Sequence, residues 1–271
     1  MNHNPLTDSL HPDCWQPLLG ECRLGRGDVC YEHTMDSTNL QLRRMALAGA
    51  PHGSLCLCEC QTAGRGRLGR SWHSPEGQGL WVSVLVRPKL TPDQAPLVTF
   101  AAAMAMQTAV SGMTDEDVLV KWPNDLVLAG KKVCGILLEV SADMDGVKHI
   151  IIGTGLNVHP GAYPPELSHQ ATCLAEHGAQ AKRAEILARY LAALEGLLIR
   201  LEQSGFDGIL SDYEKACCTL GRRVRVSGGM ELTGVAEAVA ADGALLVRGD
   251  DGKLTRVLAG DVSVRGVMGY V

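Results

Sequence analysis

Residues 61–72 read QTAGRGRLGRSW, and the rest of the chain is organised around this stretch. It places three arginines and three glycines within residues 64–70, in a chain whose formal net charge is −5. Glycine lets backbone N–H groups approach a ligand closely, and the guanidinium fork matches carboxylate and phosphate oxygens. An apolar segment leads in and Trp72 follows. We therefore interpret residues 64–70 as a flexible loop that closes over an anion, rather than as an exposed basic loop without a role.

Two common phosphate-binding motifs overlap this stretch, and neither is expected to operate. The glycines at 64, 66 and 69 match G-x-G-x-x-G, and residues 64–71 approach a P-loop with Arg70 in the lysine position. Both motifs hold phosphate at the start of a following helix. Pro75 and two nearby glycines prevent a helix there.

Composition limits the class of protein. The 271 residues fit one large domain or two unequal ones, and 46% hydrophobic with 20% charged residues indicates a well-buried globular chain. Slight acidity without a basic tail speaks against general nucleic-acid binding. No apolar run is long enough to span a membrane, and the first ten residues do not resemble a signal peptide. We expect a cytoplasmic protein with neither a nucleic-acid nor a membrane partner.

The ten cysteines form no C-x-x-C pair and show no zinc-ligand spacing. Cys56, Cys58 and Cys60 alternate with other residues, as on one face of a strand. Free cysteine is readily buried, so we expect reduced core thiols, and the ligands of any metal remain unknown.

Hydrophobic periodicity and turn residues predict an α+β fold. Residues 1–28 read as an irregular lead-in that ends in a strand at 29–31. Helices are expected at 36–48, from a cap at Thr91 through 110, at 182–201 and at 206–218, with strands at 54–60, 79–86, 118–121, 126–128, 132–140 and 149–153. Short strands at 222–226, 231–240, 244–248 and 254–258 follow, separated by turn dipeptides. This pattern predicts a main domain at 1–220 and a small β-barrel at 221–271.

Two lysines, Lys121 and Lys132, flank a Trp-Pro-Asn-Asp turn. Each could simply extend to solvent from a strand end. Together with Arg65, Arg67 and Arg70 they would neutralise a carboxylate and a polyphosphate at once, which acyl adenylation requires because the two reactants repel each other. From the residues alone, the chain is an anion-handling α+β enzyme.

Five segments together resemble the biotin protein ligase family, in that family's order and approximate spacing over about residues 29–265: DSTN at 36–39, QTAGRGRLGR at 61–70, KWPND at 121–125, Lys132 with GIL at 135–137, and GTGLN at 153–157. The resemblance implies a catalytic domain of the biotin/lipoate ligase type with a mixed or antiparallel sheet, and a C-terminal SH3-like β-barrel. It is to the short bacterial form, because residues 1–28 leave no space for a DNA-binding helix-turn-helix. A repressor role is therefore not expected.

The resemblance also implies a two-step reaction. Biotin and ATP, with Mg²⁺, would give biotinyl-5′-adenylate and pyrophosphate. A specific lysine of the biotin carboxyl carrier domain of a carboxylase would then attack the adenylate and release AMP. No bound prosthetic group is implied, and the protein is expected to be a monomer or homodimer.

Site residues follow from the same resemblance. The expected catalytic residues are Lys132 and Arg67. The expected biotin-binding residues are Ser37, Thr38, Asn39, Gln61, Arg65, Gly66, Arg67, Trp72, Lys132 and Gly135. The expected ATP-binding residues are Arg67, Arg70, Lys121, Asn124, Asn157 and Arg265.

Simpler readings exist for several of these residues. Residues 37–39 also suit a helix cap, Trp72 a core position and Arg265 an exposed strand end. Two rival functions remain open: a lipoate or octanoate ligase, which would share the fold, and a biotin-binding protein without catalysis.

Overall fold

The computed structural model describes residues 8–260, 262–266 and 270. Its main element is a seven-stranded mixed sheet in the order β1-β2-β3-β7-β6-β5-β4. The first two strands pair in parallel and all other neighbours are antiparallel, which confirms the expected α+β class with a mixed sheet. The strands are β1 (Val29–Met35), β2 (Leu55–Gln61), β3 (Gly79–Val86), β4 (Leu119–Lys121), β5 (Asp125–Leu128), β6 (Lys131–Asp143) and β7 (Gly146–Asn157).

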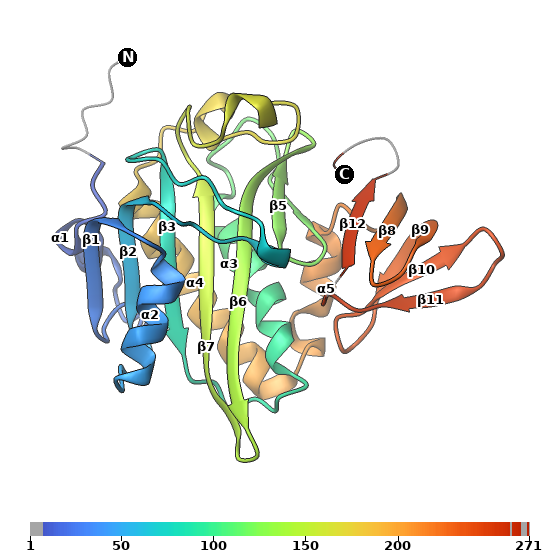
Figure 1. Ribbon diagram of the computed structural model, residues 1–271, viewed down its shortest axis with the longest axis horizontal. Helices are drawn as coiled ribbons and strands as arrows, with labels where there is room; N and C mark the ends of the chain where they lie inside the picture. The colour runs from blue at the N-terminus through green and yellow to red at the C-terminus, as the bar shows by residue number, and fades with distance from the viewer. Residues whose placement is uncertain (1–7, 261, 267–269, 271) are drawn as a thin grey trace.

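Helices cover both faces of this sheet (Figure 1). On one face α2 (Thr38–Leu47) packs against β2, β3 and β7. On the opposite face lie α3 (Val98–Val110) and α4 (Arg183–Ser204), which pack against each other, and α5 (Asp207–Ala216) follows. Ten of the 13 residues of α3 are buried, as its largely apolar sequence predicts.

Strand alternation separates two cores. On β2, Leu55 and Leu57 belong to the large core beneath α3 and α4. Cys56 and Cys58 point to the other face, where they pack in smaller clusters near α2 and Trp81. All ten cysteines are free thiols, and burial raises the pKa values of Cys56 and Cys58 far above the ordinary value. The prediction of buried reduced thiols on one strand face is confirmed, except that Cys60 is only half-buried.

The start of α3 differs from the prediction. The Thr91 backbone N–H does donate to the Gln94 side chain, as in a capping box. Residues 92–94 nevertheless form turns, Ala95–Leu97 form a 3₁₀ helix, and the α-helix begins at Val98. Pro96 explains the delay, because it has no N–H to bond to the carbonyl four residues earlier.

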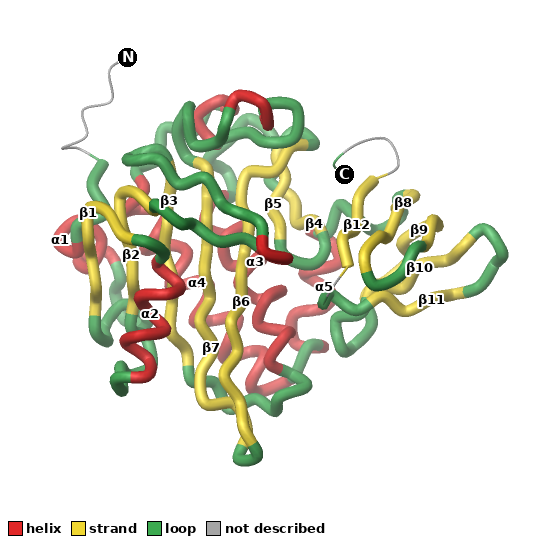
Figure 2. The backbone as a smooth tube through the Cα atoms, in the orientation of Figure 1, coloured by secondary structure: helices red, strands yellow, loops and turns green. Residues whose placement is uncertain are grey.

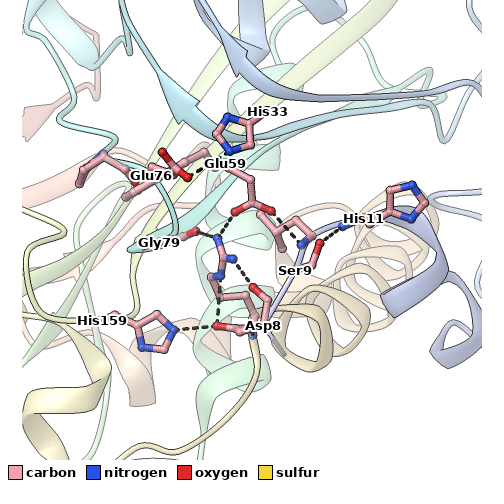
Figure 3. Close-up of polar contacts among 12 residues, drawn as sticks. Asp8, Ser9, His11, His33, Glu59, Glu76, Gly79 and His159 are labelled. Atoms are coloured by element: carbon pink, nitrogen blue, oxygen red, sulfur yellow. Dashed lines mark hydrogen bonds and ion pairs between the residues drawn. The ribbon is translucent and has the colours of Figure 1, made fainter. Parts of the chain in front are cut away.

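The lead-in is more ordered than predicted. It forms a short helix, α1 (Pro12–Trp15), followed by a 3₁₀ turn, Gln16–Leu18, and the Trp15 side chain is fully buried in the main core. A buried ion network holds this segment in place (Figure 3). The Arg183 side chain donates to Asp8 at 3.2 Å and to Glu59 at 2.7 Å, and His159 contacts Asp8 at 2.7 Å. The segment from residue 8 is thus an integral layer of the main domain.

The C-terminal part forms a separate antiparallel sheet in the order β11-β10-β9-β8-β12. Figure 2 shows this sheet beside the β4–β5 end of the main sheet. The indole of Trp122 donates to the Gly243 carbonyl at 3.0 Å and so joins the two parts. We keep the boundary near Leu220 as a proposal, which the change from helix to strands after α5 supports. The strands are β8 (Arg223–Gly228), β9 (Leu232–Val239), β10 (Leu245–Gly249), β11 (Leu254–Val257) and β12 (Val262–Gly266).

Within the described part of the chain, no helix is both long enough and apolar enough to cross a bilayer.

Candidate active site

A cavity of about 460 Å³ lies on the α2 face of the main sheet. Residues of β6 and β7 form its floor. The loop after β2 crosses in front of these two strands (Figure 2). One side is closed by β12 and Tyr270 from the C-terminal part. No helix follows the Gly/Arg loop, so the exclusion of the dinucleotide and P-loop motifs is confirmed.

The cavity brings together every residue that the sequence selected for the site, although these residues span more than two hundred positions. The residues that line it include Ser37, Thr38, Asn39, Gln61, Arg65, Gly66, Arg67, Arg70, Trp72, Lys121, Asn124, Lys132, Gly135, Asn157 and Arg265.

At one end of the cavity stands a set of hydroxyl and amide groups, which we call the polar end: the buried Ser37, Thr38 and Asn39, and the half-buried Gln61. Gln61 accepts hydrogen bonds from the backbone and hydroxyl of Thr38, at 2.9 and 3.2 Å. Ser37 precedes α2 but makes no side-chain cap, so its hydroxyl is available to the cavity. Such groups offer both donors and acceptors to a polar ligand.

The floor is built from glycines that face the same side as α2. A Cβ on Gly153 would lie 2.1 Å from Asn39 Oδ1, and one on Gly155 would lie 2.5 Å from Trp72 Nε1. Only glycine therefore lets these two side chains lie flat on the strands. The Trp72 indole N–H is buried and has no hydrogen-bond partner among the described residues.

Residues 64–71, which we call the arginine loop, fold back on themselves. The Gly66 N–H donates to the Arg70 carbonyl at 2.7 Å, and Leu68 adopts the left-handed conformation with φ of 57°. Left-handed backbone is strained for leucine, and Leu68 as a whole is about half exposed, 49%. The loop thus stores strain at the mouth of the cavity.

Arg67 ties the arginine loop to both parts of the protein. Its guanidinium donates to Asn124 Oδ1 at 2.8 Å and to the backbone carbonyls of Ala259 and Gly260. Arg65 pairs with Glu139 of β6 at 3.2 Å. The loop is therefore held over the sheet from two sides.

The other end of the cavity, the cationic end, carries Lys121, Lys132, Asp125, Arg265 and Tyr270. Lys132 Nζ lies 2.6 Å from Asp125 Oδ1 and 5.2 Å from the Trp72 ring. Lys121 Nζ lies 3.6 Å above the Tyr270 ring, and the Tyr270 hydroxyl donates to the other oxygen of Asp125. One carboxylate therefore organises two lysines and a tyrosine.

Burial sets the protonation of this end. It lowers the pKa of Lys121 to about 8, since the attraction of Asp125 only partly offsets burial and Lys132 and Arg265 add repulsion. Burial alone would raise the pKa of Asp125, but the charges of Lys132 and Lys121 outweigh it, so the pKa lies below its ordinary value. Asp125 is an anion at neutral pH.

Charge in the cavity is one-sided. Among the described lining residues six are lysine or arginine, and Asp125 is the one carboxylate. In a chain of net charge −5 this excess is local. The site is suited to a ligand, or a pair of ligands, with several negative charges.

The side-chain amides of Asn124 and Asn157, which the sequence predicts to bind ATP, each donate a hydrogen bond to a backbone carbonyl. The Asn124 side chain donates to the Ile136 carbonyl at 2.8 Å, and the Asn157 side chain donates to the Thr172 carbonyl at 2.9 Å. Both residues still line the cavity, so their contacts to ATP stay a prediction.

Sequence reasoning assigned no role to Asp125, Tyr270, Glu139 or Ser83. Asp125 stood in the quoted KWPND segment, so its position beside Lys132 could have been expected from the hairpin. Glu139 follows Gly135 by four residues on β6, and strand alternation places both on the cavity face. Tyr270 gave no signal, because nothing in its local sequence indicates contact with a strand so distant in the chain.

Two protein-family models match separate parts of this chain. Residues 30–157 match the model described as "Biotin/lipoate A/B protein ligase family", and residues 219–265 match "Biotin protein ligase C terminal domain". The expected C-terminal domain of this family is thereby confirmed.

Relatives and solved structures agree. The chain is 35% identical to the biotin–[acetyl-CoA-carboxylase] ligase of Mycobacterium tuberculosis, over 94% of this chain and 97% of that protein. It is 33% identical to the bifunctional ligase/repressor BirA of Bacillus subtilis, over 87% of this chain and 74% of that protein. The structure of the biotin protein ligase from Aquifex aeolicus in complex with biotin and ATP superposes with a TM-score of 0.77 at 29% identity, covering 88% of this chain and 99% of that one. The chain therefore belongs to the biotin protein ligase family and is a ligase.

Proposed function

We propose that this ligase forms biotinyl-5′-adenylate from biotin and ATP, and then transfers biotin to a lysine of the biotin carrier domain of a carboxylase. The observation that carries the proposal is the shared cavity, which has a neutral polar end and a cationic end joined by the glycine floor on which Trp72 lies. Biotin has the same asymmetry, with a ureido ring at one end and a carboxylate at the other.

The polar end would hold the ureido ring. A ureido group presents two N–H donors and one carbonyl acceptor, and the polar end offers hydroxyl and amide groups that match both. The thiophane ring and valeryl chain would lie on the floor, where Gly153 and Gly155 leave room beside Trp72. Gly66 in the arginine loop would close over the ligand through its backbone.

The cationic end would bring the two anionic reactants together. Lys132 stands between the Trp72 ring and Asp125, so its ammonium would contact the biotin carboxylate and the α-phosphate together. One carboxylate oxygen would attack the α-phosphorus, and the bond to the pyrophosphate oxygen would break. Fixed positive charge at this point stabilises the charge that develops on the transferred group. Arg67, Arg70, Lys121 and Arg265 would bind the phosphates and the released pyrophosphate.

Magnesium would arrive with ATP as part of the substrate. Hard cations of this kind prefer oxygen ligands and are held largely by substrate phosphates and water. Among the described lining residues Asp125 is the carboxylate that could add a protein oxygen, provided that Lys132 moves from it to the reactants.

Transfer would occur at the open side of the same cavity. The acceptor lysine, as a free amine, would attack the carbonyl carbon of the adenylate and expel AMP. The arginine loop would keep water away from the anhydride until then, because a closed site suppresses hydrolysis.

The direct test is incubation of the protein with biotin, MgATP and a carrier domain, followed by mass measurement of the carrier. Lys132→Ala should abolish adenylate formation yet leave carrier docking intact. Lys131→Ala is the matched control, since the Lys131 ammonium bonds to the Ser168 carbonyl outside the cavity. Full turnover of Lys132→Ala would reject the assignment.

A second assay, pyrophosphate exchange, separates the rivals. Exchange with lipoate or octanoate, but not with biotin, would identify the other ligase class. Tight biotin binding without exchange would identify a binding protein.

A further inference from the structure

Glu139 stands outside the cavity lining but links two of its walls. It lies on β6, and its side chain is 23% exposed. One oxygen, Oε1, accepts from Asn39 Nδ2 at 3.1 Å and from Arg65 Nη1 at 3.2 Å. A single atom therefore joins the polar end to the arginine loop.

The Asn39 side of this link is fixed in orientation. Ser83 Oγ lies 2.6 Å from Asn39 Oδ1, and the amide oxygen can only accept, so Ser83 donates. The Glu139 carboxylate oxygen accepts the other hydrogen bond, so the amide nitrogen points to it. Ser83 bonds to the amide oxygen and Glu139 to the amide nitrogen, so together they fix the orientation of the Asn39 side chain. Asn39 keeps one N–H and one lone pair for a ligand.

The Arg65 side is the looser one. The Arg65 side chain is 48% exposed, against 4% for the whole Asn39 residue. An ion pair at such an exposed position is individually weak. The Glu139 carboxylate is nevertheless the group among the described residues to which the Arg65 guanidinium donates, so this pair holds its end of the loop. Loss of the Glu139–Arg65 ion pair is therefore expected to loosen the arginine loop without unfolding the sheet.

We infer that Glu139 is a positioning residue that couples the polar end of the cavity to the arginine loop through Asn39 and Arg65. When the Asn39 side chain is fixed, its hydrogen bond holds the Glu139 carboxylate in place. The fixed carboxylate in turn holds the arginine loop through Arg65. In the proposed ligase, on which this last step rests, a ureido group bound at Asn39 would draw the loop closed over the forming adenylate.

The coupling is tested without any ligand by limited trypsin digestion at the bonds after Arg67 and Arg70, with fragments identified by mass. Glu139→Ala should raise the cleavage rate at these bonds about fivefold, the loss expected for one exposed ion pair. Asn39→Ala should also raise it in the wild-type background but not in the Glu139→Ala background. Independent, multiplicative effects of the two changes would overturn the inference, as would an unchanged cleavage rate in Glu139→Ala.

Controls keep these outcomes readable. Asp143 lies on the same strand as Glu139 and pairs with Lys148 of β7, away from the cavity. Asp143→Asn breaks this ion pair and should leave loop cleavage unchanged. If Asn39→Ala fails to fold, Asn39→Ser serves in its place. Thermal unfolding of each variant separates loop opening from global opening. Glu139→Gln, which keeps an acceptor oxygen without the charge, should restore part of the protection.

A biotin arm separates the coupling from the proposed function. Biotin should slow loop cleavage in the wild type and much less in Glu139→Ala, with KM for biotin rising more than kcat falls. Absence of biotin protection in the wild type would reject the proposed function, whereas the ligand-free cycle would still decide the coupling.

Discussion

Replacing Lys121 with methionine should stabilise the fold while it removes a positive charge from the cationic end of the cavity, which we propose binds ATP. Lys121 is 5% exposed, and its pKa falls from the ordinary 10.5 to about 8. That difference means that the fold disfavours the charged ammonium by about 3 kcal/mol. Methionine fills similar space without the charge, so at pH 7 the variant should gain up to about 3 kcal/mol in the free energy of unfolding.

The pH dependence gives the prediction its sign. Below pH 8 the lysine is charged in both the folded and unfolded states, so the penalty is fully present. Between about 8 and 10.5 the folded lysine loses its proton while the unfolded one keeps it, and stability rises with pH. The advantage of Lys121→Met should therefore shrink through this window and vanish above it.

Urea unfolding of the wild type and variant at several pH values measures this difference directly. Lys253→Met, at an exposed turn position, is the control and should change stability little. Calorimetry should show that Lys121→Met binds ATP at least about tenfold more weakly, because one phosphate-binding charge is lost. Equal unfolding free energies for Lys121→Met and the wild type at pH 7, with parallel pH curves, would refute the reasoning.

Three further changes are expected to have distinct effects. Gly155→Ala places a methyl group 2.5 Å from the Trp72 indole nitrogen and should weaken biotin binding by about tenfold or more in calorimetry, whereas Gly196→Ala, with open space around it in a helix, should add about 1 kcal/mol of stability. Arg183→Met leaves two buried carboxylates without their cation and should cost about 3–5 kcal/mol in urea unfolding; a loss below about 1 kcal/mol would contradict the buried-network account. Arg67→Lys keeps the charge but cannot reach three oxygens in a fork, so KM for ATP should rise about tenfold, and a kinetically silent variant would show that charge alone suffices.

Local signals predicted the regular elements well where the sequence pattern was long. The β3 strand was placed at its observed bounds, Gly79–Val86, because continuous apolar residues sit between turn-forming ones. The predicted start of α3 at Thr91 was wrong. Thr91 is a good cap, but Pro96 has no N–H to continue the helical hydrogen bonds from that cap. Four residues of α1 carry no period to detect, so the buried Trp15 was missed.

The site was predictable for a different reason. Its residues recur in family motifs, so the resemblance selected them without any knowledge of distance. What the motifs could not supply was the connection between them. Glu139 and Tyr270 act through long-range contacts, to Asn39 and to Asp125, and such pairings depend on strand register and on how the C-terminal sheet docks. A sequence motif contains no information on strand register or on how the C-terminal sheet docks.

The indole N–H of Trp72, buried and without an acceptor among the described residues, has a consequence for stability. A donor buried without an acceptor costs about 1–3 kcal/mol. The nitrogen has almost no accessible surface and lies against Gly155, so a molecule bound in the cavity cannot remove this cost. A ring without that donor, such as phenylalanine, would avoid it, so position 72 keeps the larger indole at the expense of stability.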